Sequence, residues 1–396
     1  RMANRNNFHV VRGKSEAEAS LSKKIRMHKM QSLLRIVLIA VVAAGLVAML
    51  VTQYKNQVFS GYVISKQAEF TVLENVSYLE NDGSIIRYSK DGISNTDAKG
   101  NMIWNLTYEM QSPMVRRADG YAAVGDYNGH IIYLIDNSGS TYEVDTRLPI
   151  RDFAISSTGV VAAILEDSGN SWINVYNKEG TQIVEAKATM SKTGYPLALS
   201  ISGEVMGVSY FYVDGNTMRS SVTFYNFGGI GENTTDHIVS SYAYTDAVVP
   251  MIQFMNSETS FAVADNRLMF FEGSKKPVSS ADILLDGEIQ GVYYSDSYVG
   301  LLFYDQTGES KYRIDVYDTS GKKVTSYGFD MDFKDILIRN NQIMIYNESK
   351  CMVVGLNEKI KYAGTFEDHV HYVAATDSPR KFVLIMNDGL ATMEFN

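Results

Sequence analysis

A short pattern that recurs from Lys55 onward constrains the fold more than any other feature of the chain. In the segments YLIDNSG, NVYNKEG and DVYDTSG, an apolar strand is followed by Asp or Asn and, three residues later, by glycine. Eight such units follow one another at a spacing of about 43 residues. Repeats of this size with several short strands each are typical of propeller blades. The sequence therefore predicts an all-β fold, an eight-bladed β-propeller.

The repeated turn has the residues expected of a tight hairpin. The turn-opening positions are Asp97, Asp136, Asn177, Asn226, Glu272, Asp318, Leu356 and Asn396. Glycine, which readily takes the positive φ of such a turn, follows three residues later at Gly100, Gly139, Gly180, Gly229 and Gly321. The fifth and seventh units have Lys275 and Lys359 at this place, so they are assigned by their spacing more than by their residues.

The third unit shows the internal organisation. Its segments RDFAISS, GVVAAILED, SWINVYNKEG and TQIVEAKA read as four successive strands separated by turn residues. The chain contains 30 Gly and 26 Tyr but only 6 Pro, which favours short strands joined by glycine turns. A stacked solenoid is disfavoured because the units read as antiparallel hairpins. A seven-bladed ring, with units of about 48 residues, is the alternative blade count.

The last unit lacks a fourth strand. Its third strand is GLATMEFN, residues 389–396, and the segment before the first complete unit contains GYVIS, which has strand character but no blade of its own. A propeller must pair its first and last strands to avoid an open edge. We therefore expect residues 61–65 to form the outer strand of the last blade, within a propeller that spans residues 58–396.

An uncharged apolar segment precedes the repeats. Residues 36–54 are long enough to cross a bilayer as a helix, and nine Lys and Arg but only two Glu stand in residues 1–35. A cleaved signal peptide is the competing interpretation, but the long basic region favours an uncleaved signal anchor. A basic flank stays in the cytoplasm. We expect a partly helical cytoplasmic tail at 1–35, one plasma-membrane span at 36–54 and an extracytoplasmic propeller.

One segment carries a family resemblance. DAKGNMIWNL, with Asp97, Gly100 and Trp104, resembles the blade motif of quinoprotein-type, PQQ-like and WD40-like propellers. The resemblance implies that Asp and Gly build the turn and that Trp packs between blades. The layout of basic tail, single span and acidic repeats is similar to an uncharacterised family of single-pass, membrane-anchored propellers of clostridial Gram-positive bacteria. That resemblance implies a fold and a cellular address but no activity.

Searches for chemistry in the sequence give few candidates. The single cysteine, Cys351, excludes an internal disulfide, and no phosphate-binding loop or HExxH motif occurs. The best metal candidates are His369 and His371 with Glu367, since two histidines two residues apart share one face of a strand. Ordinary surface or core histidines are the simpler interpretation. The sequence therefore predicts no cofactor and no assembled metal site.

A second acidic segment and the tyrosines complete the candidates. FDMDFKD, with Asp330, Asp332 and Asp335, raises the possibility of calcium binding, although a solvated connection between blades explains it more simply. Tyrosine is concentrated in 208–216, 240–246 and 291–305, where it fits either blade core or a binding face.

Two classes of function follow from these observations. The first is a noncatalytic scaffold or recognition module for an envelope protein or cell-wall polymer, or a ligand sensor that signals through a membrane partner. The second is a glycan-active hydrolase or lyase. The first is favoured because no catalytic set can be assembled from the sequence. The net charge of −9 argues against a nucleic-acid partner.

Overall fold

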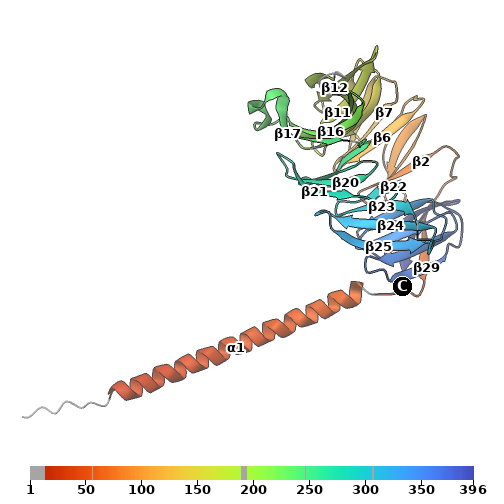
Figure 1. Ribbon diagram of the computed structural model, residues 1–396. Coiled ribbons are helices and arrows are strands. Elements are labelled where there is room, and N and C mark those ends of the chain that lie inside the picture. The colour runs from red at the N-terminus through yellow and green to blue at the C-terminus, as the bar shows by residue number, and fades with distance from the viewer. Residues whose placement is uncertain (1–13, 56, 189–193, 246, 306) are drawn as a thin grey trace, which may run out of the picture. The chain divides into compact units, whose positions relative to one another are not determined.

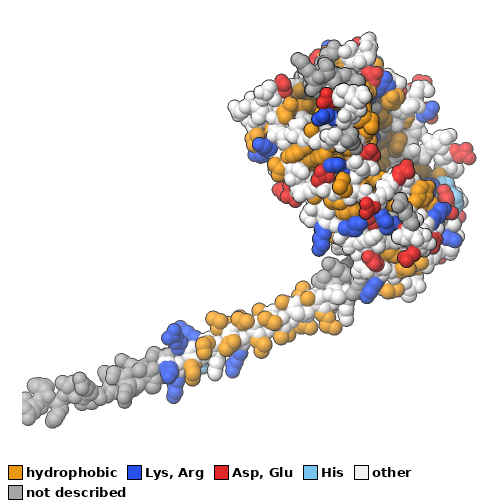
Figure 2. Space-filling view, in the orientation of Figure 1, with side chains coloured by type: hydrophobic (Ala, Val, Ile, Leu, Met, Phe, Trp, Pro, Cys, Tyr) orange, Lys and Arg blue, Asp and Glu red, His pale blue; other side chains and the backbone are white. Residues whose placement is uncertain are grey.

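The computed structural model describes residues 14–55, 57–188, 194–245, 247–305 and 307–396, and the chain divides into a helical unit and a β unit (Figure 1). The helical unit contains α1 (Lys14–Lys55). Its segment Arg26–Met49 is long and apolar enough to cross a membrane, with a mean hydropathy of 2.5. Figure 2 shows apolar side chains along this helix and a cluster of Lys and Arg before them.

The β unit consists of eight four-stranded antiparallel sheets, each a propeller blade. Blade 1 comprises β2 (Ser77–Asn81), β3 (Ser84–Ser89), β4 (Gly92–Thr96) and β5 (Met102–Thr107). Blade 2 comprises β6 (Pro113–Ala118), β7 (Tyr121–Asp126), β8 (Ile131–Asp136) and β9 (Thr141–Asp145). Blade 3 comprises β10 (Ile150–Ile155), β11 (Val161–Asp167), β12 (Asn170–Tyr176) and β13 (Gln182–Ala188). Blade 4 comprises β14 (Tyr195–Ser202), β15 (Val205–Asp214), β16 (Thr217–Asn226) and β17 (Ile238–Thr245).

The second half of the ring repeats this order. Blade 5 comprises β18 (Met251–Phe254), β19 (Thr259–Val263), β20 (Arg267–Glu272) and β21 (Val278–Leu284). Blade 6 comprises β22 (Ile289–Tyr294), β23 (Tyr298–Tyr304), β24 (Tyr312–Asp318) and β25 (Lys323–Phe329). Blade 7 comprises β26 (Asp335–Arg339), β27 (Gln342–Tyr346), β28 (Lys350–Gly355) and β29 (Ile360–Thr365). Blade 8 comprises β30 (Val370–Ala375), β31 (Lys381–Met386), β32 (Gly389–Phe395) and β1 (Tyr62–Glu69).

Blade 8 is completed by the strand that precedes blade 1. β1 pairs antiparallel with β32, from Tyr62 opposite Phe395 to Glu69 opposite Gly389. Phe59, just before β1, is buried and stacks on Phe395 with 4.9 Å between the ring centroids. The pairing expected of residues 61–65 is present, and the strand extends to Glu69. Eight blades, rather than the alternative seven, make up the ring.

The predicted turn geometry is confirmed in four blades. Gly100, Gly139, Gly180 and Gly321 all have positive φ, between 78° and 89°. In the first of these turns the Gly100 amide donates to the Asp97 carbonyl, and the Asp97 carboxylate accepts bonds from the amides of Lys99 and Asn101. Asp136, Asn177 and Asp318 accept equivalent backbone bonds. The side chain that opens the turn therefore satisfies the amides left free by the reversal.

Three other turns differ from the prediction. Gly229 is not among the positive-φ residues, because Asn226 is followed by an insertion with two short 3₁₀ helices, η1 (Gly231–Asn233) and η2 (Thr235–His237). In blade 7 the turn opens at Gly355, one residue before the predicted Leu356, and Glu358 takes the positive φ. In blade 5 the positive φ falls on Gly273 instead of three residues after Glu272.

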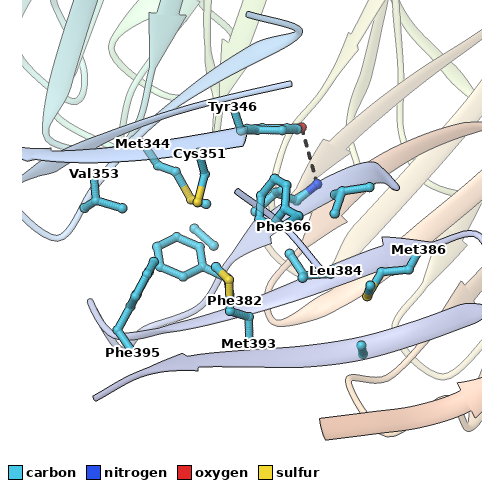
Figure 3. Packing of buried hydrophobic residues seen from close by; sticks show 14 of the residues in the cluster. Met344, Tyr346, Cys351, Val353, Phe366, Phe382, Leu384, Met386, Met393 and Phe395 are labelled. Atoms are coloured by element: carbon cyan, nitrogen blue, oxygen red, sulfur yellow. Dashed lines mark hydrogen bonds between the residues drawn. The ribbon is translucent and has the colours of Figure 1, made fainter. Parts of the chain in front are cut away.

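The core lies between neighbouring blades. Trp104 of β5 is buried in a cluster with Ile86 of its own blade and Val124 of blade 2. A β-carbon on Gly139, in the turn of blade 2, would stand 2.8 Å from that of Trp104. The expected packing of this tryptophan between blades is thus observed. Figure 3 shows the corresponding cluster of blades 7 and 8, where Phe382 and Phe395 pack near Cys351.

Candidate recognition site on the loop face

The two faces of the ring are built from different connections. In blades 1 to 7 the first strand leads to the second, and the third to the fourth, through connections on one side, here called the turn face. Blade 8 differs only in that its third and fourth strands, β32 and β1, are not consecutive in the chain. The hairpin between the second and third strands and the connection to the next blade lie on the opposite side, the loop face. β1 enters the ring at the turn face, because Tyr62 pairs with the end of β32. The loop face therefore lies at the far end of this first strand.

A cavity of about 560 Å³ opens on the loop face, at the beginnings of the first strands of blades 1, 7 and 8. The segment 72–76, which connects β1 to β2, forms one wall. Tyr78, Asp335, Tyr346, His371 and Tyr372 contribute side chains to the lining. The volume lies in the range of small-molecule pockets, and aromatic rings with a few polar groups are the usual lining of such pockets.

Asp335 is the unusual acid of this cavity. It begins β26, and its carboxylate accepts a hydrogen bond of 2.8 Å from the amide of Ile336. Burial raises the pKa of the Asp335 carboxyl above its ordinary value, because water no longer solvates the charge. The adjacent Lys334 directs its ammonium to Glu348 at 3.5 Å. Among the described residues, Asp335 forms no ion pair within 4 Å.

Tyrosine hydroxyls surround this carboxyl without bonding to it. The negative charge of Asp335 adds to burial in raising the pKa of Tyr293, to about 12, and also raises the pKa of Tyr346. The Tyr346 hydroxyl accepts a bond from the Val373 amide, which is dashed in Figure 3. Tyr372 accepts a bond from the amide of Glu80. Within the described residues, neither of these two hydroxyls bonds to the Asp335 carboxylate, whose hydrogen bond comes from the Ile336 amide.

Tyr78 and Tyr372 form an aromatic wall of the cavity. Their rings stack with 5.9 Å between the centroids, and they come from the first strands of blades 1 and 8. The buried Tyr78 hydroxyl has no hydrogen-bond partner in the part of the chain that the structure describes. An unsatisfied buried hydroxyl is costly to the folded protein, and this oxygen atom is closed off from solvent, so the ring face is what Tyr78 offers to the cavity.

One member of the predicted histidine pair, His371, lines the same cavity. His369 and His371 have ring centroids 4.7 Å apart, and Nε2 of His371 lies 2.8 Å from Oδ1 of Asn387. Within the described ranges, no three His, Cys, Asp or Glu side chains gather in an arrangement for a metal ion. Glu367 therefore does not complete a metal site with these histidines.

The acidic segment FDMDFKD is divided between two environments. Asp330 accepts a bond from the backbone amide of Lys311 at 2.8 Å, and Asp332 lies 2.5 Å from the ammonium of the same lysine. Asp335 instead lies in the cavity. The three carboxylates are not brought together, which removes the calcium interpretation of this segment.

The longest strands of the propeller extend the loop face in blade 4. β15 and β16 have ten residues each, whereas the second and third strands of the other blades have five to seven. Near the end of this hairpin Val213 pairs with Met218, and the two side chains are 56% and 50% exposed. The tyrosines of this segment stand out in the sequence, but its continuation as a hairpin with an apolar end is visible only in the structure.

The turn face has a smaller cavity of about 320 Å³ beside Arg339 and Asp377. Arg339 lies 3.4 Å from Glu80 and 3.2 Å from Asp377, and Arg117 lies 3.3 Å from Glu80. Glu80, on the first strand of blade 1, thus links arginines of blades 2 and 7. Because the opposite charges of these ion pairs neutralise each other, we interpret them as structural contacts that connect the blades.

Cys351 is buried in the core of blades 7 and 8. Burial raises the pKa of its thiol to about 12. Only the thiolate is a strong nucleophile, so this cysteine is unreactive near neutral pH.

Comparison with known proteins places the chain in a family. A family model described as "Family of unknown function (DUF5711)" matches residues 55–395. The chain belongs to this family. The matched residues cover the whole propeller of this DUF5711 protein, while no curated protein matches its sequence.

Solved structures resemble the DUF5711 propeller in fold. BamB from Moraxella catarrhalis aligns with a TM-score of 0.50 and 12% identity, over 84% of this chain and 100% of that chain. Apo AztD from Citrobacter koseri aligns with a TM-score of 0.55 and 12% identity, over 77% and 90%. At such low identity the similarity shows the propeller fold alone.

The site was only partly accessible to sequence reasoning. His371 and Asp335 were both noted, but as members of two separate metal-like clusters. Their shared cavity depends on blades 7 and 8 being neighbours, and Tyr78 of blade 1 joins them only because the ring closes. A search for the residues that begin the first strand of each blade would have brought these side chains together.

Proposed function

We propose that this protein is a membrane-anchored, noncatalytic recognition module whose loop face binds a protein or polymer of the cell envelope. The asymmetry of the two faces carries this proposal. Outside the insertion of blade 4, the turn face is closed by short turns whose polar groups bond to one another, as at Asp97 and Asp318. The loop face has both the larger cavity and the long hairpin with exposed Val213 and Met218. Exposed apolar groups at the end of a rigid hairpin are suited to contact a partner.

The anchor supports the same proposal. Helix α1 ends at Lys55, and the strand that closes the ring begins at Tyr62. A span at Arg26–Met49 with its basic flank in the cytoplasm would hold the propeller outside the membrane. The chain enters the ring at the turn face, which leaves the loop face at the opposite end of β1.

Site-specific photocrosslinking in intact cells tests the proposal. A photoreactive amino acid at Val213 samples the loop face, and one at the exposed Ser320 samples the turn face. We expect Val213 to give one recurrent adduct with an envelope protein or polymer, and Ser320 to give none. Equal labelling from both positions, or no adduct from either, would contradict recognition through the loop face.

A further inference from the structure

The cavity beside Asp335 has features that define the ligand it would take. It is large enough for a side chain or small molecule, with a volume of about 560 Å³. Its acid is partly removed from water, accepts one hydrogen bond from Ile336, and has no cation within ion-pair distance among the described residues. An uncompensated buried charge is unfavourable, so the free protein carries a cost that a ligand can relieve.

The charged side chains that line the cavity indicate the charge of that ligand. Lys334 also lines the cavity, but its ammonium pairs with the carboxylate of Glu348 at 3.5 Å. Glu74, in the wall formed by 72–76, adds a second carboxylate to the lining. The cavity therefore favours a cation over an anion.

The aromatic lining decides the kind of cation. The stacked rings of Tyr78 and Tyr372 form one wall, and Tyr88 and Tyr346 also line the cavity. Aromatic faces attract organic cations and pack against their methylene groups. A bare metal ion would use none of these apolar surfaces, whereas an alkylammonium group uses all of them.

We propose that the loop-face cavity binds an alkylammonium group, with the carboxylate of Asp335 as its counter-ion and the tyrosine rings around its methylene chain. The group has two possible sources, a free small amine or a lysine side chain of a bound protein. The inference rests on the proposed function, because it gives the recognised chemistry of the same face. Amine binding by the isolated protein nevertheless requires no macromolecular partner.

Calorimetry on the full chain in a neutral detergent tests this inference. The probes are n-pentylamine, which represents a free amine, and Nα-acetyl-lysine amide, which represents a lysine side chain. Nα-acetyl-norleucine amide lacks the ammonium and is the control ligand. We expect one or both amines to bind with 1:1 stoichiometry and the norleucine derivative to bind at least about tenfold more weakly, since a charge-assisted bond is lost.

Two variants locate the binding. Asp335→Asn keeps an acceptor for the Ile336 amide and removes the charge, so we expect it to weaken amine binding by about tenfold or more. Asp332→Asn removes an acid from the same connection, where it contacts Lys311 outside the cavity, and should leave binding unchanged. Absence of amine binding, or equal binding by Asp335→Asn and the unmodified chain, would overturn the inference. If Val213 still gave its adduct in that case, the proposed function would stand without it.

Discussion

The β-carbon of Ala68 occupies the place where a side chain on Gly100 would begin. Ala68 belongs to β1, the outer strand of blade 8, and Gly100 belongs to the turn of blade 1. The same relationship joins Trp104 to Gly139 one blade further on. The contact between Ala68 and Gly100 shows that the closing strand takes the role of a normal fourth strand toward the next blade.

Gly100→Ala tests this packing. The substitution combines positive φ with a clash against Ala68, so we expect a loss of about 1–3 kcal/mol for overpacking, in addition to about 1 kcal/mol for backbone strain. Gly120→Ala is the matched control, because Gly120 has a φ of 86° and open space around it. Chemical denaturation should show the larger loss at Gly100. Ala68→Gly in the same chain should restore part of it, and equal losses at Gly100 and Gly120 would contradict the packing argument.

Removal of the closing strand tests its contribution to stability. A chain that starts at Phe70 lacks Phe59 and β1, which exposes Phe395 and the edge of β32. We expect it to unfold at a markedly lower temperature than a chain that starts at Gln57, as followed by circular dichroism. Equal melting temperatures would mean that β1 is dispensable for the ring.

The buried acid predicts an unusual pH dependence. The pKa of Asp335 is raised in the folded protein, so the folded state binds more protons than the unfolded state between the ordinary pKa and the raised one. Stability contributed by this group is therefore present at low pH and is lost as pH rises through the folded pKa. Asp335→Asn should stabilise the protein at neutral pH, and this gain should disappear near pH 3.8.

Thermal unfolding at several pH values, in the presence and absence of the substitution, measures this effect. The tyrosines at the cavity stay protonated over this pH range because their pKa is raised, and Glu74, Lys334 and His371 are all retained in the variant. A loss of stability at neutral pH would show that the Asp335 charge is compensated in the folded protein.

Cysteine labelling tests the orientation. The native Cys351 is buried and the pKa of its thiol is raised, so we expect it not to react with the maleimide. In intact cells a membrane-impermeant maleimide should label Lys99→Cys in the propeller and spare Lys24→Cys in the basic tail. Permeabilisation should then expose the second site. Labelling of Lys24→Cys alone in intact cells would reverse the proposed topology.

Sequence alone predicted the repeat and the closing strand and favoured eight blades, while the sheets of the folded chain decided between eight blades and seven. The repeat and the closing strand can be predicted from short stretches of sequence. A turn that needs a positive φ favours glycine at that position, and a strand with one buried face has apolar residues at alternate positions. The turn glycines Gly100 and Gly321 were predictable for this reason. Gly229 was not, because an insertion at that turn removes the need for positive φ.

Only the tertiary structure decided what lies together around the ring. Tyr78 and Tyr372 are far apart in sequence, and they stack because closure by β1 places blade 8 beside blade 1. Asp335 looked like one of three equivalent acids in FDMDFKD, yet burial separates it from Asp330 and Asp332. The exposure of a side chain to water depends on all the blades around it. A short sequence pattern therefore cannot predict which of these acids is buried.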